Sequence, residues 1–199
     1  MSEWWTYRPS DFLLFAPRTY YRLFELYNQE IWPLHIVALA AGVTILVLMR
    51  ARAAWRGRVV AAVLAACWLW VAWAFHWQRY ETINWAAGYF AVGFALQALL
   101  LIWVGIARDR LRFDSNPSTR TRIGAAIFLF ALIVQPLLGL LVGRQWLQLE
   151  FFGVAPDPTA LATVGLLLAA NRVPWAAWPL PVLWCLIGGT TSFLMSAAR

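Results

Sequence analysis

Two histidines are the side chains best placed for chemistry, because each lies inside an apolar run. His35 is four residues into a run that begins at Ile31, and His76 lies near the end of a run that closes at Gln78. If the two runs form antiparallel helices, both imidazoles reach a similar depth. There they can ligate a haem iron, contribute to a metal site, or take up and release protons. A hydrogen bond to a neighbouring group is the simpler interpretation of each.

Carboxylates are expected at the same end of the molecule: Glu30, Glu81, Glu150 and Asp157. Asp157-Pro158-Thr159 is typical of a helix start, with Asp157 as N-cap and Pro158 at the first helical position. A zinc site normally needs three or four protein ligands, and no His or Cys spacing supplies them. We therefore predict ligand or proton handling with Glu81 and Asp157, and we expect no cofactor. His35 and His76 are the only metal candidates.

Two glutamines are the main polar side chains in the middle of apolar runs, Gln97 and Gln135. Gln135 precedes Pro136, which leaves the carbonyl of Leu132 without its helical partner and can kink the helix. Such side chains either join helices by hydrogen bonds or line a permeation path. We count both among the candidate ligand-handling residues.

Searches for catalytic motifs find none. The sequence has no nucleophile elbow, no His-Glu-x-x-His, no P-loop and no dinucleotide-binding fingerprint. It also has no lysine, which excludes Schiff-base chemistry. Cys67 and Cys185 are isolated in apolar runs, where cysteine usually behaves as a small hydrophobic side chain. We name no catalytic residue and favour a function without catalysis.

The elements that must position these residues are membrane helices. Of 199 residues, 62% are hydrophobic and 13% are charged, against about 25% charged in a soluble domain. A soluble enzyme and a disordered protein are thereby excluded. We predict an all-α polytopic transmembrane helix bundle, and its six segments are residues 31–49, 59–78, 85–107, 123–142, 158–173 and 181–198. The fifth segment is short for a ~30 Å hydrocarbon core, so it either crosses the membrane or forms a re-entrant pair with the sixth.

Arginine placement predicts the orientation. Two loops carry nine of the sixteen arginines: Arg50, Arg52, Arg56, Arg58, Arg108, Arg110, Arg112, Arg120 and Arg122. By the positive-inside rule these loops face the cytoplasm of a bacterial inner membrane, which puts the N-terminus in the periplasm. Because the arginines lie in short loops between apolar runs, nucleic-acid binding is not expected.

The N-terminal residues 1–30 are predicted to be an aromatic segment at the outer face, followed by a single transmembrane domain over 31–199. Residues 17–29 fit an amphipathic helix, with Arg18 and Arg22 on one face and Tyr20, Phe24 and Tyr27 on the other. This helix either lies on the membrane surface or packs on the external loops as a lid.

The chain is tryptophan-rich, with fourteen residues of this type. Most are at predicted segment ends, where tryptophan anchors a membrane helix. Trp70, Trp73 and Trp77 form a stripe that either lines an aromatic pocket or faces lipid. Small-residue pairs such as Gly188-x-x-x-Ser192 favour close helix packing.

A family resemblance rests on several runs of residues. They are Trp4 to Phe15, Tyr21 to Asn28, Ile31-Trp32-Pro33, Phe152-Gly153, Pro156 to Thr159, and Trp184 to Gly189. Together they resemble a bacterial membrane family catalogued as domain of unknown function 6064, over essentially the whole chain. The resemblance implies an integral membrane protein and brings no activity, cofactor or site residue.

Three functions follow as hypotheses. The first is binding or transport of a small solute or ion, gated by protonation of His35 or His76. The second is a non-catalytic accessory or assembly subunit that docks a membrane protein partner or another copy of this chain. The third is a bis-His haem or metal redox protein. In each case the lipid bilayer is the expected surrounding.

Overall fold

The structure is a computed structural model that describes residues 15–114, 118–171 and 173–197. The predicted N-terminal segment is therefore described only from Phe15 onward. Within these ranges the fold is all-helical, and no β-strand is formed; Arg112 and Asn171 make one isolated β-bridge. The predicted all-α class is confirmed.

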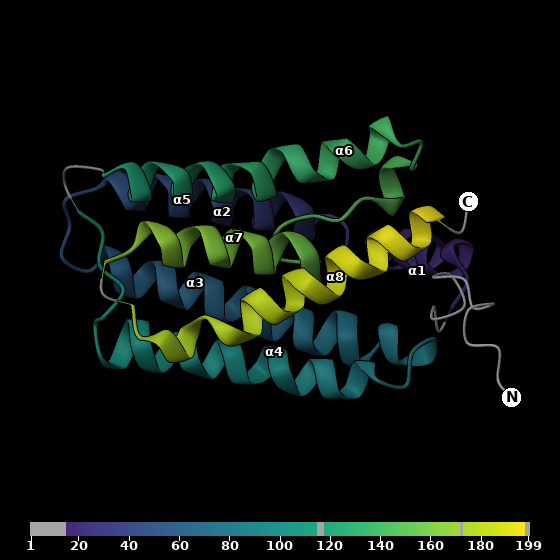
Figure 1. The fold of residues 1–199 in the computed structure, drawn as a ribbon, viewed down its shortest axis with the longest axis horizontal. Coiled ribbons are helices and arrows are strands. Elements are labelled where there is room, and N and C mark those ends of the chain that lie inside the picture. Colours follow the sequence, from purple (N-terminus) through teal and green to yellow (C-terminus); the bar gives the residue numbers. More distant parts are fainter. Residues whose placement is uncertain (1–14, 115–117, 172, 198–199) are drawn as a thin grey trace, which may run out of the picture.

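Helices lie side by side along the long axis of the molecule (Figure 1). The helices of this bundle are α2 (Leu34–Arg50), α3 (Arg56–Trp70), α4 (Ala87–Leu101), α5 (Thr119–Leu129), α6 (Gln135–Leu141), α7 (Pro156–Ala169) and α8 (Pro179–Ala197). Helix α1 (Pro17–Glu30) lies across one end of the bundle, at 89° to α2. We call this end the α1 end.

Three helices continue through π-helical turns, at Val71–Trp77 after α3, at Ile102–Ala107 after α4, and at Phe130–Val134 between α5 and α6. The last of these ends two residues before Pro136, whose ring nitrogen cannot donate to Leu132. Local π-helical geometry is a known way to accommodate a proline inside a membrane helix. It joins α5 and α6 into one long element.

Four helical stretches are long and apolar enough to cross a membrane: Arg56–Thr82, Ala87–Ala107, Thr119–Leu141 and Trp175–Ser196. The bent pair α1 and α2 passes the same test when taken together, which gives up to five. Each predicted segment corresponds to a helix whose ends differ by a few residues. The fifth corresponds to α7, whose 14 residues are fewer than the ~20 that a full crossing needs.

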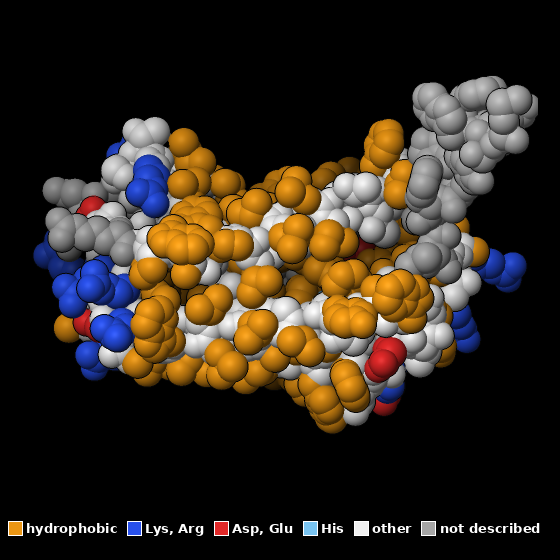
Figure 2. Space-filling view, turned by 60° about the horizontal axis from the view of Figure 1, so that its bottom comes forward, with side chains coloured by type: hydrophobic (Ala, Val, Ile, Leu, Met, Phe, Trp, Pro, Cys, Tyr) orange, Lys and Arg blue, Asp and Glu red, His pale blue; other side chains and the backbone are white. Residues whose placement is uncertain are grey.

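Charge and apolar surface are separated along the bundle (Figure 2). On the face shown, arginines gather at the end opposite α1, which we call the arginine-rich end, and hydrophobic side chains cover the surface between the two ends. Exposed tryptophans such as Trp73, Trp85 and Trp103 belong to this apolar surface. The distribution is that of a membrane helix bundle, with its apolar sides turned outward.

Helix α7 occupies the middle of the bundle, between α5 and α8 (Figure 1). It approaches α5 through two glycines: a Cβ atom at Gly124 would lie 2.4 Å from the carbonyl oxygen of Gly165. Along its other faces Thr159 and Thr163 are fully buried, and the Trp68 indole donates to Thr163 Oγ1 at 2.9 Å. The start of α7 is thereby fixed deep inside the protein.

Candidate functional site

Asp157 is partly buried at the start of α7, where α8 contacts its carboxyl group. The indole of Trp184 donates to Asp157 Oδ1 at 2.8 Å. One turn further along α8, a Cβ atom at Gly188 would lie 2.5 Å from the same oxygen. Only glycine leaves room there. Gly188 was predicted to allow close helix packing, and in the structure it makes space for the Asp157 carboxyl group.

The predicted cap at this helix start is wrong. The helix begins at Pro156, one residue before Asp157, and its N-cap is Ala155, which has no side-chain capping bond. A proline is favourable at the first helical position because its missing N–H has no helical partner there. The Asp157 carboxyl is consequently free to bind another helix rather than its own.

Glu150 and Arg144 extend this site toward the α1 end. Arg144 donates to Glu150 Oε1 at 2.8 Å, and the two side chains are 14% and 9% exposed. The charge of Glu150 acts on the Asp157 carboxyl group. We call Arg144, Glu150 and Asp157 the buried charge cluster. Burial, and then the charge of Glu150, raise the pKa of Asp157 well above its ordinary value.

Helix α1 fixes the segment that carries Glu150. The hydroxyl of Tyr27 donates to the carbonyl of Val154 at 2.8 Å, and the amide of Asn28 donates to the carbonyls of Leu147 and Leu149 at 2.8 and 2.9 Å. The buried face of α1 is thus the predicted aromatic one, and it packs on the segment between α6 and α7. Its contacts agree with the lid interpretation of this helix.

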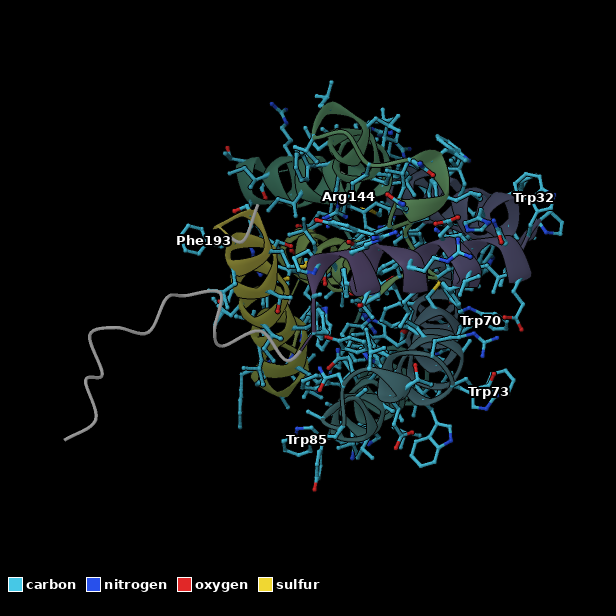
Figure 3. All side chains as sticks on the ribbon, turned by 90° about the vertical axis from the view of Figure 1, so that its right-hand side faces the viewer. Trp32, Trp70, Trp73, Trp85, Arg144 and Phe193 are labelled. Carbon is cyan, nitrogen blue, oxygen red and sulfur yellow. The ribbon has the colours of Figure 1, made fainter. Side chains whose placement is uncertain are left out.

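The cluster lies centrally at the α1 end. Figure 3 looks onto this end and shows Arg144 near the middle, beside α1, whereas Trp32, Trp73 and Phe193 project from the rim. The Arg144 guanidinium also lies 4.7 Å from the centroid of the Tyr21 ring. Its cation–π contact with Tyr21 and its ion pair with Glu150 connect α1 to the segment between α6 and α7.

His76 is fully buried in the π-helical turn after α3, and neither ring nitrogen has a hydrogen-bond partner among the described residues. Its ring packs against Phe94 and Trp184, with centroids 4.5 and 4.8 Å away. Trp184 therefore contacts His76 with its ring and Asp157 with its N–H. The structure brings these two predicted site residues together through one indole.

His35 lies in different surroundings. Its Nε2 is 3.0 Å from Asn28 Oδ1, and its ring packs against Phe151 with centroids 5.0 Å apart. It lines a surface pocket of about 250 Å³ with Trp32 and Trp146. Among the described residues, the aromatic rings that contact His35 do not contact His76. Over the described ranges, no group of three or more His, Cys, Asp or Glu side chains could hold a metal ion.

The remaining predicted residues lie apart from the contacts of Asp157. Gln97 is fully buried and donates to the carbonyl of Ala177 at 3.2 Å, which joins α4 to the segment before α8. Gln135 begins α6, and its buried Oε1 has no partner among the described residues. Glu81 is exposed in the turn Tyr80–Thr82.

The tryptophan stripe has more than one environment. Trp73 and Trp77 are exposed, whereas the Trp70 indole donates to the hydroxyl of Tyr27 at 2.9 Å. Trp70 and Trp73 also line a surface pocket of about 470 Å³ beside α1. Part of the stripe therefore anchors α1 rather than facing lipid.

Sequence reasoning did not identify Arg144, Trp184 or Gly188 as site residues. Arg144 is the single arginine of its predicted loop, and Trp184 lies within an apolar segment rather than at its end. A tryptophan inside such a segment needs an acceptor for its indole N–H, which is a signal the sequence did contain.

Comparisons with known proteins identify a family and no function. A family model described as "Family of unknown function (DUF6064)" matches residues 18–199. No curated protein matches the chain, and no solved structure matches it.

Proposed function

The chain belongs to DUF6064, a family of unknown function, and we propose that it binds a small solute or ion and carries it across a membrane. Four helical stretches are long and apolar enough to cross a membrane, and the buried charge cluster supplies a polar site within the bundle. The cluster is the observation that carries the proposal.

The burial of this cluster is the physical reason for proposing a function in transport. Removing charged groups from water costs several kcal/mol per ion, and apolar side chains of similar volume usually serve a structural role equally well. Charged groups inside a membrane bundle are accordingly rare and tend to mark the paths of protons, ions or solutes. Arg144 and Glu150 are almost fully removed from solvent, so their charges favour a functional interpretation.

The balance of charge in the cluster indicates which ligand it suits. Two carboxyl groups face one guanidinium, and the second carboxyl group must bind a proton or a small cation to avoid an uncompensated negative charge. The raised pKa of Asp157 has this cause together with burial. The cluster therefore favours a proton or a small cation over an anion.

A pocket at the α1 end offers a route to the cluster. It has a volume of about 740 Å³, and it is lined by Pro17, Arg18, Tyr21, Arg22, Glu25, Gln145 and Gln148. Tyr21 lines this pocket and also contacts Arg144. Tyr21 therefore connects this pocket to Arg144, and displacement of Arg144 from Glu150 is the expected opening step for a ligand that enters here.

In this mechanism His76 controls, by its protonation, whether a proton can leave Asp157 toward the bundle interior. Its ring nitrogens have no partner in the described structure, so an imidazolium there would need a hydrogen-bond acceptor that the present packing does not supply. Trp184 separates it from Asp157 and must shift for a proton to pass between them. Protonation of His76 is thus expected to move Trp184 and to loosen the seat of Asp157.

The proposal also covers location and orientation. It assigns the chain to a bacterial inner membrane with six membrane segments, the arginine-rich end in the cytoplasm and the α1 end in the periplasm. Reporter fusions after Met49 and after Ala107 test this orientation, and both are expected to report the cytoplasm. Periplasmic reporter signals at both sites would contradict it.

Flux measurements in proteoliposomes test the transport function. We expect the wild-type protein to support gradient-driven movement of protons, Na⁺, K⁺ or methylammonium, and Asp157→Asn to abolish it. Glu30→Gln is the matched control, because Glu30 is exposed, pairs with Arg79 and does not line the entry pocket, so its loss should leave the flux unchanged. Absence of flux for all four ions with wild-type protein would overturn the proposal and favour the accessory-subunit function.

A further inference from the structure

The arginine-rich end contains a second polar pocket, remote from the buried charge cluster. Its volume is about 530 Å³, and it is lined by Arg108, Asp109, Arg110, Arg112, Phe113, Asp114 and Asn171. The Asn171 N–H donates to the carbonyl of Arg112 at 2.7 Å. This bond connects the loop after α4 to the residues that follow α7, and it fixes one side of the pocket.

Some of the arginines around this pocket form ion pairs and others do not. Asp109 has a left-handed backbone conformation with φ of 49°, and its carboxylate pairs with Arg112 at 3.1 Å and with Arg58 at 3.5 Å. The ion pairs of the described structure include neither Arg108 nor Arg110. Two guanidinium groups therefore remain available to an anion.

An apolar face continues directly from these arginines. The Arg108 guanidinium lies 5.2 Å from the centroid of the Trp103 ring. Trp103 is 48% exposed, and Ile102 and Ile106 beside it on the same helical extension are also exposed. Guanidinium groups at the end of a tryptophan-bearing apolar face match the two parts of a phospholipid, its phosphate and its acyl chains.

We propose that this pocket binds the headgroup phosphate of an anionic phospholipid, with Arg108 and Arg110 as the ligands and the acyl chains along Ile102, Trp103 and Ile106. Arginine suits this role because its planar guanidinium can donate two parallel hydrogen bonds to phosphate oxygens. The apolar face argues for a lipid rather than free phosphate, since inorganic phosphate gains nothing from it. The inference does not depend on the transport function.

Native mass spectrometry of the purified protein with defined lipids tests the site. We expect retention of phosphatidylglycerol in preference to phosphatidylcholine. Each arginine near an anionic surface contributes about fivefold to binding, so Arg108→Ala with Arg110→Ala should lower phosphatidylglycerol retention by about 30-fold. Replacing both residues with lysine should retain most of the binding, because the positive charges remain.

The control variant removes the same charge from the other end, by Arg18→Ala with Arg22→Ala, and should keep wild-type lipid binding. Circular dichroism of every variant checks that the helices are retained. Equal retention of phosphatidylglycerol by both alanine pairs would overturn the proposal, and so would displacement of the lipid by millimolar inorganic phosphate.

Discussion

The arginine ion pair of the buried charge cluster at the α1 end differs in exposure from the arginine ion pairs at the arginine-rich end. At the arginine-rich end, Arg58 and Arg112 pair with Asp109 while their side chains remain 56% and 71% exposed. At the α1 end, Arg144 pairs with Glu150 while both side chains are almost fully buried. The first arrangement keeps its charges in water, and the second removes them from it.

The difference lies in how strongly each pair depends on its partner. An exposed ion pair contributes about 0–1 kcal/mol to stability, because water and salt screen it. Breaking a buried pair costs about 3–5 kcal/mol, because one charge is left without compensation in the interior. The loss of one exposed pair should therefore matter little at the first end, whereas the site at the second end depends on a single arginine.

The largest effect is expected from Arg144→Ala, which leaves Glu150 buried without its partner. We predict a loss of about 3–5 kcal/mol in the free energy of unfolding, measured by denaturation in detergent. Arg112→Ala at the other end is the matched control and should cost less than about 1 kcal/mol. Equal costs for the two variants would remove the distinction between the ends.

Gly188→Ala should have the next largest effect, because its Cβ atom would lie 2.5 Å from Asp157 Oδ1. We predict a loss of about 1–3 kcal/mol from overpacking, and partial recovery when Asp157→Ala is added. Gly189→Ala is the control, since among the described residues no atom beyond the backbone of its own helix lies within 4 Å of the added Cβ. If both alanine variants unfold at the same denaturant concentration, the seat for Asp157 is not as described.

Asp157→Asn should change the pH dependence of stability. The pKa of Asp157 is raised in the folded protein, so above about pH 3.9 the unfolded chain loses a proton that the folded protein keeps. Rising pH therefore destabilises the wild type relative to the variant, by about 1.4 kcal/mol per pH unit until the raised pKa is reached. Thermal unfolding across pH measures this difference, and a difference independent of pH would contradict it.

The smallest effect is expected from Arg58→Ala. Its 3.5 Å contact with Asp109 is exposed, and Arg112 also pairs with that carboxylate. We predict a change below about 0.5 kcal/mol that shrinks further when salt is raised. A loss comparable to that of Arg144→Ala would show that exposure does not govern the strength of these pairs.

The elements of the fold could be predicted because they depend on local patterns. Apolar runs gave each bundle helix to within a few residues, and the alternation of Arg22 with Phe24 and Tyr27 gave the buried face of α1. These features follow from hydrophobic periodicity along the chain. The charge asymmetry between the two ends is visible for the same reason.

The site could be predicted only in part, because it depends on contacts between distant residues. His76 and Asp157 were both identified, but their shared neighbour Trp184 comes from a third segment, and His35 is held elsewhere by Asn28. The role of Gly188 follows from a close approach of α7 to α8, which no spacing within either helix reveals. Similar predicted depth was therefore not enough to place two histidines in one site.

Infrared difference spectroscopy of the purified protein can show whether Asp157 holds a proton, because it detects the C=O stretch of a protonated carboxyl group. During titration from acid to alkaline pH, the wild type is predicted to keep a protonated-carboxyl band well above the ordinary pKa of aspartate. Asp157→Asn should remove that band and Glu25→Gln should retain it. If the wild-type band disappears near pH 4, or persists unchanged in Asp157→Asn, Asp157 is not the proton-binding group of this bundle.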